Sequence, residues 1–295
     1  MSASNSTTDE AGVRGEVQYL DKSPLYETEK PFECTIEPWH FPGARQNNLS
    51  CTAYQVLFHD ISASKEKFSL DVHGFQVETH ISALVYDDFW SDDLVQNLYY
   101  PECEEFFKTH LGADEVYIFD HVPKLTARQV RKADAVVEIA GVNEFQRLLK
   151  PSIRVHVDQT TESAIRRVKD VVPDRAESLL ARRFRIIKYV TRPAANLDAL
   201  LTSSDLVSQH FLGEQYYLRY SPRHRWWYQK DMTHQQLLAI KCFDSNAVKP
   251  DSRVARFAPH ASFMTDDNGN DDGALPIPTR PRESIEIRAL VFSAD

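Results

Sequence analysis

The sequence predicts a mainly β fold, in which an antiparallel barrel or jelly roll carries helices on its outside. Short stretches of alternating apolar and polar residues recur along the chain, most densely after residue 183, and this alternation is typical of half-buried strands. Helical patterns are confined to residues 88–111 and 162–183, so strands and helices do not alternate as they would around a parallel sheet. With 295 residues, of which 42% are hydrophobic, the chain can bury a large core.

The N-terminal part of the chain is predicted to differ from the rest. Residues 1–15 are small, polar and without pattern, so we expect a disordered tail. Residues 16–295 are expected to form a single domain. Its first segment, residues 16–50, contains four prolines and scattered aromatic residues, which favours an extended arm over regular structure. Such an arm could cover the body of the protein or join two copies into a homodimer.

The first half of the body is predicted to contain strands and one helical layer. Strands are indicated at residues 53–60, 75–80 and 116–121. Residues 88–111 are predicted to be largely helical, with Pro101 beginning a second helix and Gly112 capping its C-terminus. Residues 127–150 are expected to be mostly irregular.

The second half is predicted to be dominated by strands. Helical patterns cover residues 162–171 and 173–183, and Pro173 suits the first helical position. Strands are predicted at residues 153–158, 184–190, 215–220, 225–229, 237–243, 254–259 and 284–292. The polar residues 265–281 include glycine and proline and predict a mobile loop.

Composition and the absence of common motifs narrow the function. The chain has 34 basic and 43 acidic residues, a net charge of −9, which argues against a nucleic-acid-binding protein. It has neither an apolar run long enough to span a membrane nor the apolar core of a signal peptide, so we expect a cytoplasmic protein without membrane contacts. Its four cysteines form no CxxC pair, and no GxGxxG, GxxxxGK[ST] or GxSxG motif is present, which disfavours zinc sites, nucleotide cradles and α/β-hydrolases.

The alternation in residues 153–158 suggests a metal site. Side chains of a strand change face at every residue, so His156 and Asp158 point to the same side. An imidazole and a carboxylate are two members of the facial triad that binds Fe(II) and leaves positions open for oxygen and an organic ligand. His260, which follows the predicted strand 254–259, is the best candidate for the third ligand, although His121 and His224 also border predicted strands.

The last predicted strand carries a candidate anion anchor. The period of two places Arg282, Ser284, Glu286 and Arg288 on one face of this strand. An arginine fork with a hydroxyl two residues later is suited to a carboxylate, such as the distal carboxylate of 2-oxoglutarate. The sequence favours Arg282 with Ser284, because Arg282 lies nearer to His260. Arg288 is the alternative, and the two arginines are roughly 20 Å apart along a strand, too far for both to bind one small diacid.

The chain also resembles a known family in a series of short segments. The segments are FSLDVHGFQ (residues 68–76), VYIFDH (116–121), VHVDQT (155–160), HRWWY (224–228), IKCFDS (240–245), RFAPHASF (256–263) and PRESIEIRALVF (281–292). Their order resembles that of the mostly fungal non-haem iron oxygenases, which include the AsaB-type proteins, the CmcJ-like (cephalosporin 7α-hydroxylase-related) proteins and the gibberellin desaturases. The resemblance covers nearly the whole chain from about Val17 onward.

The resemblance implies a catalytic domain with a double-stranded β-helix (cupin-like) core. It implies Fe(II) bound by His156, Asp158 and His260, 2-oxoglutarate bound by Arg282 and Ser284, and O₂ as oxidant. Members of the family hydroxylate, desaturate or oxidatively cyclise small specialised metabolites. This chain has Thr191 where the family usually has a tryptophan, so the substrate of a relative does not transfer. Candidate substrate-binding residues near this position are Lys188, Tyr189 and Arg192.

Two other classes of function stay open on sequence alone. A cupin-like isomerase or hydrolase would use the metal without 2-oxoglutarate, and Arg282 would then be structural. A binding module that has kept the barrel would not need the metal at all. The presence of three candidate ligands together with an RxS segment disfavours both.

Overall fold

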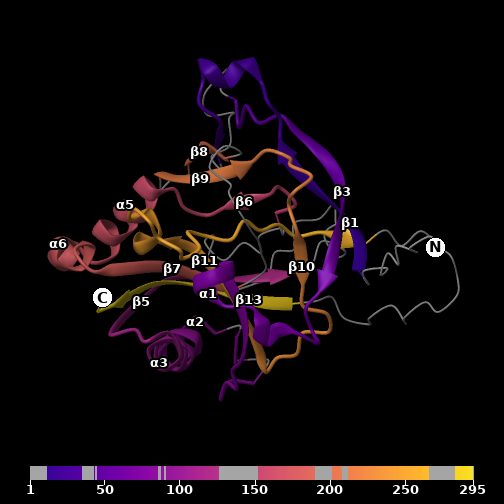
Figure 1. Cartoon of the computed structure of the whole chain (residues 1–295). Helices are drawn as coiled ribbons and strands as arrows, with labels where there is room; N and C mark the ends of the chain where they lie inside the picture. The colour runs from indigo at the N-terminus through magenta and orange to yellow at the C-terminus, as the bar shows by residue number, and fades with distance from the viewer. Residues whose placement is uncertain are drawn as a thin grey trace, which may run out of the picture.

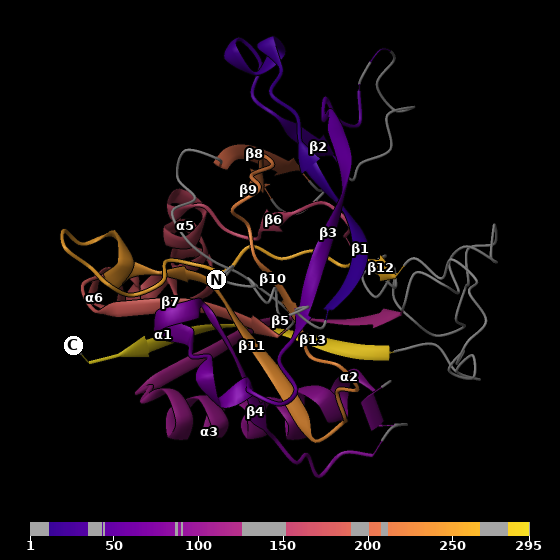
Figure 2. The ribbon, with the colours of Figure 1, turned by 45° about the vertical axis from the view of Figure 1, so that its right-hand side comes forward.

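The computed structural model describes residues 12–34, 43, 45–85, 88–89, 91–125, 152–189, 201–207, 212–265 and 283–294. Its strands form three sheets (Figures 1 and 2). A sheet in the order β4-β11-β7-β13-β5 is antiparallel throughout. Its strands are β4 (Phe75–Thr79), β11 (Gln236–Asp244), β7 (Arg183–Tyr189), β13 (Glu283–Ser293) and β5 (Glu115–Leu125).

A smaller sheet faces this five-stranded sheet and completes the jelly roll. Its order is β2-β8-β9-β6, and in Figures 1 and 2 β8, β9 and β6 lie above β7, β11 and β13. The strands are β2 (Phe32–Cys34), β8 (Leu201–Val207), β9 (Leu212–Leu218) and β6 (His156–Val157). The two sheets therefore form the two layers expected of a double-stranded β-helix.

The third sheet lies along one side of these layers, in the order β10-β3-β1-β12 (Figure 2). Its strands are β10 (Trp226–Tyr228), β3 (Cys51–Asp60), β1 (Gly12–Leu20) and β12 (Met264–Thr265). β1 pairs with β3 along its whole length and alternates buried with exposed side chains toward its end. The N-terminal segment is thus built into the sheet structure of its own chain.

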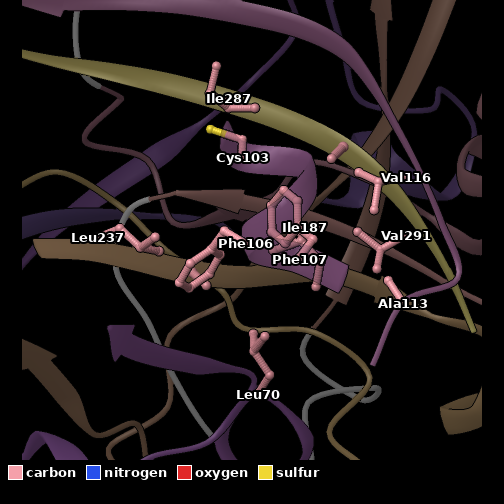
Figure 3. Packing of buried hydrophobic residues seen from close by; sticks show 12 residues of the cluster. Leu70, Cys103, Phe106, Phe107, Ala113, Val116, Ile187, Leu237, Ile287 and Val291 are labelled. Carbon is pink, nitrogen blue, oxygen red and sulfur yellow. The ribbon is translucent and has the colours of Figure 1, made fainter. Parts of the chain in front are cut away.

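Helix α3 (Tyr100–Leu111) covers the outer face of the five-stranded sheet. Its Phe106 and Phe107 pack against Ile187, Ile287 and Val291 of the sheet (Figure 3). A π-helical turn over Val95–Tyr99 joins α2 (Asp92–Leu94) to α3 without a break. Pro101 therefore lies in the first turn of α3, as predicted, but the backbone reaches it by continuing an existing helix. The wider turn accommodates a proline ring that would collide with the preceding turn of a regular helix.

The remaining helical segments are short. Gly112 ends α3 with a left-handed φ of 58°, as predicted for a C-terminal cap.

Two helices pack over one end of the sheets, around Ile186 and Phe292: α5 (Thr161–Val171) and α6 (Ala176–Leu180). The others are α1 (Leu70–His73) and the 3₁₀ turns Pro24–Glu27, Lys65–Lys67, Pro173–Arg175 and Ser245–Val248. No helix within the described ranges is both long and apolar enough to cross a bilayer.

Four expectations from the sequence need correction. The tail predicted at 1–15 is too long, because β1 begins at Gly12 and its ladder with β3 orders the backbone. Residues 16–50 contain β1 and β2, so the predicted arm has regular structure in part. The strand predicted at 153–158 is reduced to His156–Val157, and 254–259 forms no strand. The strand β8 was not predicted.

Other predictions remain untested. Residues 127–150 lie outside the described residues, as does the predicted mobile loop 265–281 apart from Thr265. The single domain over residues 16–295 stays a prediction.

Candidate metal centre

Two neighbouring residues, His156 and Asp158, meet the distant His260 between the two facing sheets. One ligand atom from each of His156, Asp158 and His260 lies within 4.8 Å of the other two. The Nε2 atoms of His156 and His260 are 3.3 and 3.4 Å from Oδ1 of Asp158. The two imidazole rings have centroids 4.5 Å apart. The structure therefore brings together the three residues that the sequence suggested as metal ligands.

The backbone holds the two histidines directly opposite each other. The His156 N–H donates to the His260 carbonyl at 3.1 Å, and the His260 N–H donates to the His156 carbonyl at 2.9 Å. Residues paired in this way in antiparallel strands project their side chains to the same face. On its other side His156 pairs with Tyr217 of β9, which ties it to the smaller sheet.

Backbone carbonyls also fix the tautomer of both rings. Nδ1 of His156 lies 2.8 Å from the carbonyl oxygen of Arg154, and Nδ1 of His260 lies 3.0 Å from that of Ala258. A carbonyl oxygen can only accept, so each Nδ1 carries the proton and each Nε2 offers a lone pair. Burial, together with Lys188 and His156, lowers the pKa of His260 to about 4. His260 is therefore neutral at physiological pH, which is the form that binds a metal.

The two oxygens of Asp158 have different surroundings. Oδ1 faces the histidines, whereas Oδ2 lies 2.8 Å from Nζ of Lys188 and 3.2 Å from Nε of Arg288. Burial alone would raise the pKa of Asp158, but the charge of Lys188 and contacts with both histidines hold it well below its usual range. Burial would lower the pKa of Lys188, but Asp158 and Glu286 raise it. The aspartate is thus ionised and is held by one oxygen, with the other oxygen turned to the histidines.

A buried charge cluster extends from Asp158 across β7 and β13. Lys188 and Arg288 are register neighbours on these strands. Glu286, only 1% exposed, lies 3.5 Å from Lys188 Nζ and also contacts Arg288, which in turn pairs with Asp120 of β5. The sequence pointed to Glu286 and Arg288 only through their shared face, and it gave no signal for Asp120.

The remaining predicted site residues have different outcomes. Glu286 and Arg288 face the site, while Ile287 and Ala289 face α3, so the predicted alternation of β13 is confirmed. Ser284 is half-buried on this strand. Three predicted residues or their side chains lie outside the described part of the chain, namely Arg282, Arg192 and the Tyr189 side chain.

The donor set suits Fe(II). Two imidazole nitrogens and one carboxylate oxygen form the two-histidine, one-carboxylate set that binds this ion and leaves coordination positions open. The Nε2 atom of His260 is fully buried and has no hydrogen-bond partner among the residues that the structure describes. A buried polar atom without a partner is costly, and a metal ion would satisfy this one.

Comparisons with known proteins find relatives that are named as iron-dependent oxygenases. A family model described as "Oxidoreductase/YMDC permease-like domain" matches residues 17–292. The Fe(II)/2-oxoglutarate-dependent dioxygenase nvfI of Aspergillus novofumigatus is 28% identical over 85% of this chain and 87% of its own length. The hydroxylase/desaturase asaB of Aspergillus flavus is 30% identical over 81% of each chain.

A solved structure has the same fold. The iron and alpha-ketoglutarate-dependent endoperoxidase NvfI superimposes with a TM-score of 0.73 at 21% identity, covering 96% of this chain and 99% of the other. This likeness establishes the jelly-roll core. With the family match over most of its length, the chain belongs to this oxidoreductase family, beside the fungal Fe(II)/2-oxoglutarate-dependent dioxygenases and hydroxylase/desaturases.

Proposed function

We propose that this protein is an Fe(II)/2-oxoglutarate-dependent oxygenase that hydroxylates, desaturates or oxidatively cyclises a small specialised metabolite. The observation that carries the proposal is the convergence of His156 Nε2, His260 Nε2 and Asp158 Oδ1 in a buried site. Relatives named as Fe(II)/2-oxoglutarate-dependent dioxygenase and hydroxylase/desaturase support the reaction class.

In this proposal His156, Asp158 and His260 hold Fe(II). The bound metal, with 2-oxoglutarate and O₂, would supply oxidation of a substrate C–H bond coupled to oxidative decarboxylation of 2-oxoglutarate to succinate and CO₂. The protein fixes the tautomer and the direction of both imidazoles, because the carbonyls of Arg154 and Ala258 accept their Nδ1 protons. Lys188 holds the second oxygen of Asp158, which fixes the rotation of the carboxylate and leaves Oδ1 for the metal.

The anchor for the distal carboxylate of 2-oxoglutarate is a separate question. Sequence proximity to His260 favoured Arg282 with Ser284, but the described contacts support Arg288. Its guanidinium touches Asp158, and the ammonium of Lys188 lies on the neighbouring strand. Ser284 is four residues further along β13, roughly 13 Å away from Arg288. A diacid chelated to the metal is therefore within easier reach of Arg288 than of Ser284.

Anaerobic titration of the Fe(II)-loaded protein with 2-oxoglutarate tests both the function and the anchor. Chelation gives a weak visible charge-transfer band, and its midpoint reports the affinity for 2-oxoglutarate. Arg288→Lys and Arg282→Lys are a matched pair, because each keeps the charge but loses the two-pronged hydrogen bond. In the variant of the true anchor, the midpoint of the band should lie at a roughly tenfold or higher concentration of 2-oxoglutarate. A hydrogen bond to a charged group contributes about 1.5–3 kcal/mol.

The outcomes separate the alternatives. A higher 2-oxoglutarate midpoint in Arg282→Lys but not in Arg288→Lys would assign the anchor to Arg282 and Ser284. A wild-type protein that binds Fe(II) but gives no band would favour a cupin-like isomerase or hydrolase that uses the metal without 2-oxoglutarate. Ligand binding that is unchanged after the metal has been removed would favour a binding module.

Location and partners are further proposals. All four cysteines are free thiols, which fits the reducing cytoplasm. The net charge of −9 supports a small-molecule substrate and not a nucleic acid. A homodimer through residues 16–50 stays a proposal, and sedimentation velocity of the intact chain tests it. A single species near the monomer mass of 33.9 kDa would count against it.

A further inference from the structure

The segment that carries the third candidate ligand has no strand ladder of its own. Residues 255–259, which lead to His260, have no regular secondary structure. Their backbone is held at separate points instead: the Ala255 N–H donates to the Asp71 carbonyl at 2.6 Å, and the Ala258 N–H donates to the Lys241 carbonyl at 2.8 Å. His260 itself is bridged to His156, and the segment that leads to it depends on α1 and β11, the elements that supply these two carbonyls.

Gly74, directly after α1, lies against this segment. It ends α1 with a left-handed φ of 77°, and its carbonyl accepts the Lys241 N–H at 2.7 Å. A β-carbon on Gly74 would lie 2.9 Å from the carbonyl oxygen of Phe257 and 3.0 Å from the β-carbon of Ala258. Any side chain at this position would therefore push the backbone whose Ala258 carbonyl holds Nδ1 of His260.

An ionic cluster, in which Lys241 and Asp244 are buried, links α1 to the large sheet. Nζ of Lys241, which is 0% exposed, lies 2.9 Å from Oδ1 of Asp71 in α1 and 2.6 Å from Oδ2 of Asp244 in β11. Arg183 of β7 contacts the same two carboxylates at 2.6 and 2.7 Å. Four charged side chains thus tie α1, which ends at Gly74, to two strands of the large sheet.

We propose that Gly74 is a positioning residue for His260. The turn at Gly74, fixed to β11 by the ionic cluster, sets the place of the Ala258 carbonyl and through it the direction of His260 Nε2. This inference rests on the proposed metal site. It also gives a role to residues 68–76 and 240–245, two segments that contain none of the three candidate ligands.

Gly74→Ala and Gly112→Ala form a matched test. Both glycines have a left-handed φ, 77° and 58°, but a β-carbon on Gly112 would meet nothing within 4 Å. Both variants should lower the unfolding temperature of the metal-free protein, because alanine is strained at these φ values. Only Gly74→Ala should weaken the binding of Co(II), a spectroscopic substitute for Fe(II). We expect a roughly 10- to 100-fold higher Kd, as for other changes around metal ligands.

A third variant separates backbone strain from the collision. Asparagine adopts a left-handed backbone more readily than alanine but still has a β-carbon. Gly74→Asn should therefore unfold at a higher temperature than Gly74→Ala but bind Co(II) as weakly. It replaces Gly74→Ala if that variant does not fold. Co(II) affinity equal to wild type in either Gly74 variant would overturn the inference. A wild-type protein that does not bind Co(II) would overturn the proposed function as well.

Discussion

Loss of the buried ammonium of Lys241 should cost this protein much of its stability. Lys241 is 0% exposed and lies between the carboxylates of Asp71 and Asp244, the second of which is also 0% exposed at its side chain. Lys241→Met keeps most of the side-chain volume but leaves two carboxylates to share the single guanidinium of Arg183. Removing one partner from a buried ion pair typically costs about 3–5 kcal/mol. Because Arg183 remains, we expect the lower end, about 3 kcal/mol.

Thermal and urea unfolding of the metal-free protein measure this loss. A destabilisation of about 3 kcal/mol corresponds to a fall in Tm of roughly 5 °C for a chain of this size, because the entropy of unfolding is about 2.1 cal/mol/K per residue. Lys67→Met, at an exposed lysine, is the control and should change stability by less than about 0.5 kcal/mol.

A double variant tests the charge argument itself. Lys241→Met combined with Asp244→Asn removes one charge of each sign, so its loss should be smaller than the sum of the two single losses. Strictly additive losses, or a Lys241→Met protein within about 1 kcal/mol of wild type, would refute the reasoning that a buried, uncompensated carboxylate dominates the cost.

Three further predictions concern Asp71 and the metal centre. Arg183 and Lys241 outweigh burial and lower the pKa of Asp71 from 3.8 to about 2, so its stabilising charge is fully present above pH 4 and is lost as the pH falls toward 2. Asp71→Asn should flatten this part of a urea-midpoint profile against pH, and an unchanged slope would contradict the assignment. Co(II) at 100 times its Kd should stabilise the wild-type protein by about 2.7 kcal/mol in thermal unfolding, and His260→Ala should abolish the gain. Glutarate, which lacks the keto group of 2-oxoglutarate, should bind the Mn(II)-loaded protein about tenfold more tightly than the metal-free protein in calorimetry, and equal affinities would refute a charge effect of the metal.

The sequence was sufficient to predict features that depend on neighbouring residues alone. The period of two placed His156 with Asp158, and Glu286 with Arg288, on shared faces, and all four side chains meet at the site. This held although the strand predicted around His156 is only two residues long. An extended backbone alternates its side chains whether or not it has a ladder, so the direction of a side chain is more predictable than the length of the strand.

The sequence was insufficient to predict contacts that depend on how distant segments pair. The contacts of Lys241 with Asp71 and of Lys188 with Asp158 depend on how strands pair, and nothing near these residues in the sequence specifies their partners. Nothing near Gly74 in the sequence indicates that it lies against Phe257, 183 positions later. β1 was missed because the prolines that follow it suggested irregular structure, while its ladder with β3 is formed further along the chain.

The charges around Asp158 suggest an order of binding. Lys188 and Arg288 contact three carboxylates, those of Asp158, Glu286 and Asp120, so one negative charge is left over in the metal-free cluster. Such a cluster disfavours a dianion and favours a divalent cation. Bound Fe(II) would turn the excess into one positive charge, and 2-oxoglutarate would then be attracted to the same place. Under the proposed function, Lys188 and Arg288 would therefore act in two steps: they would hold Asp158 for the metal, and they would attract the diacid only after the metal has bound.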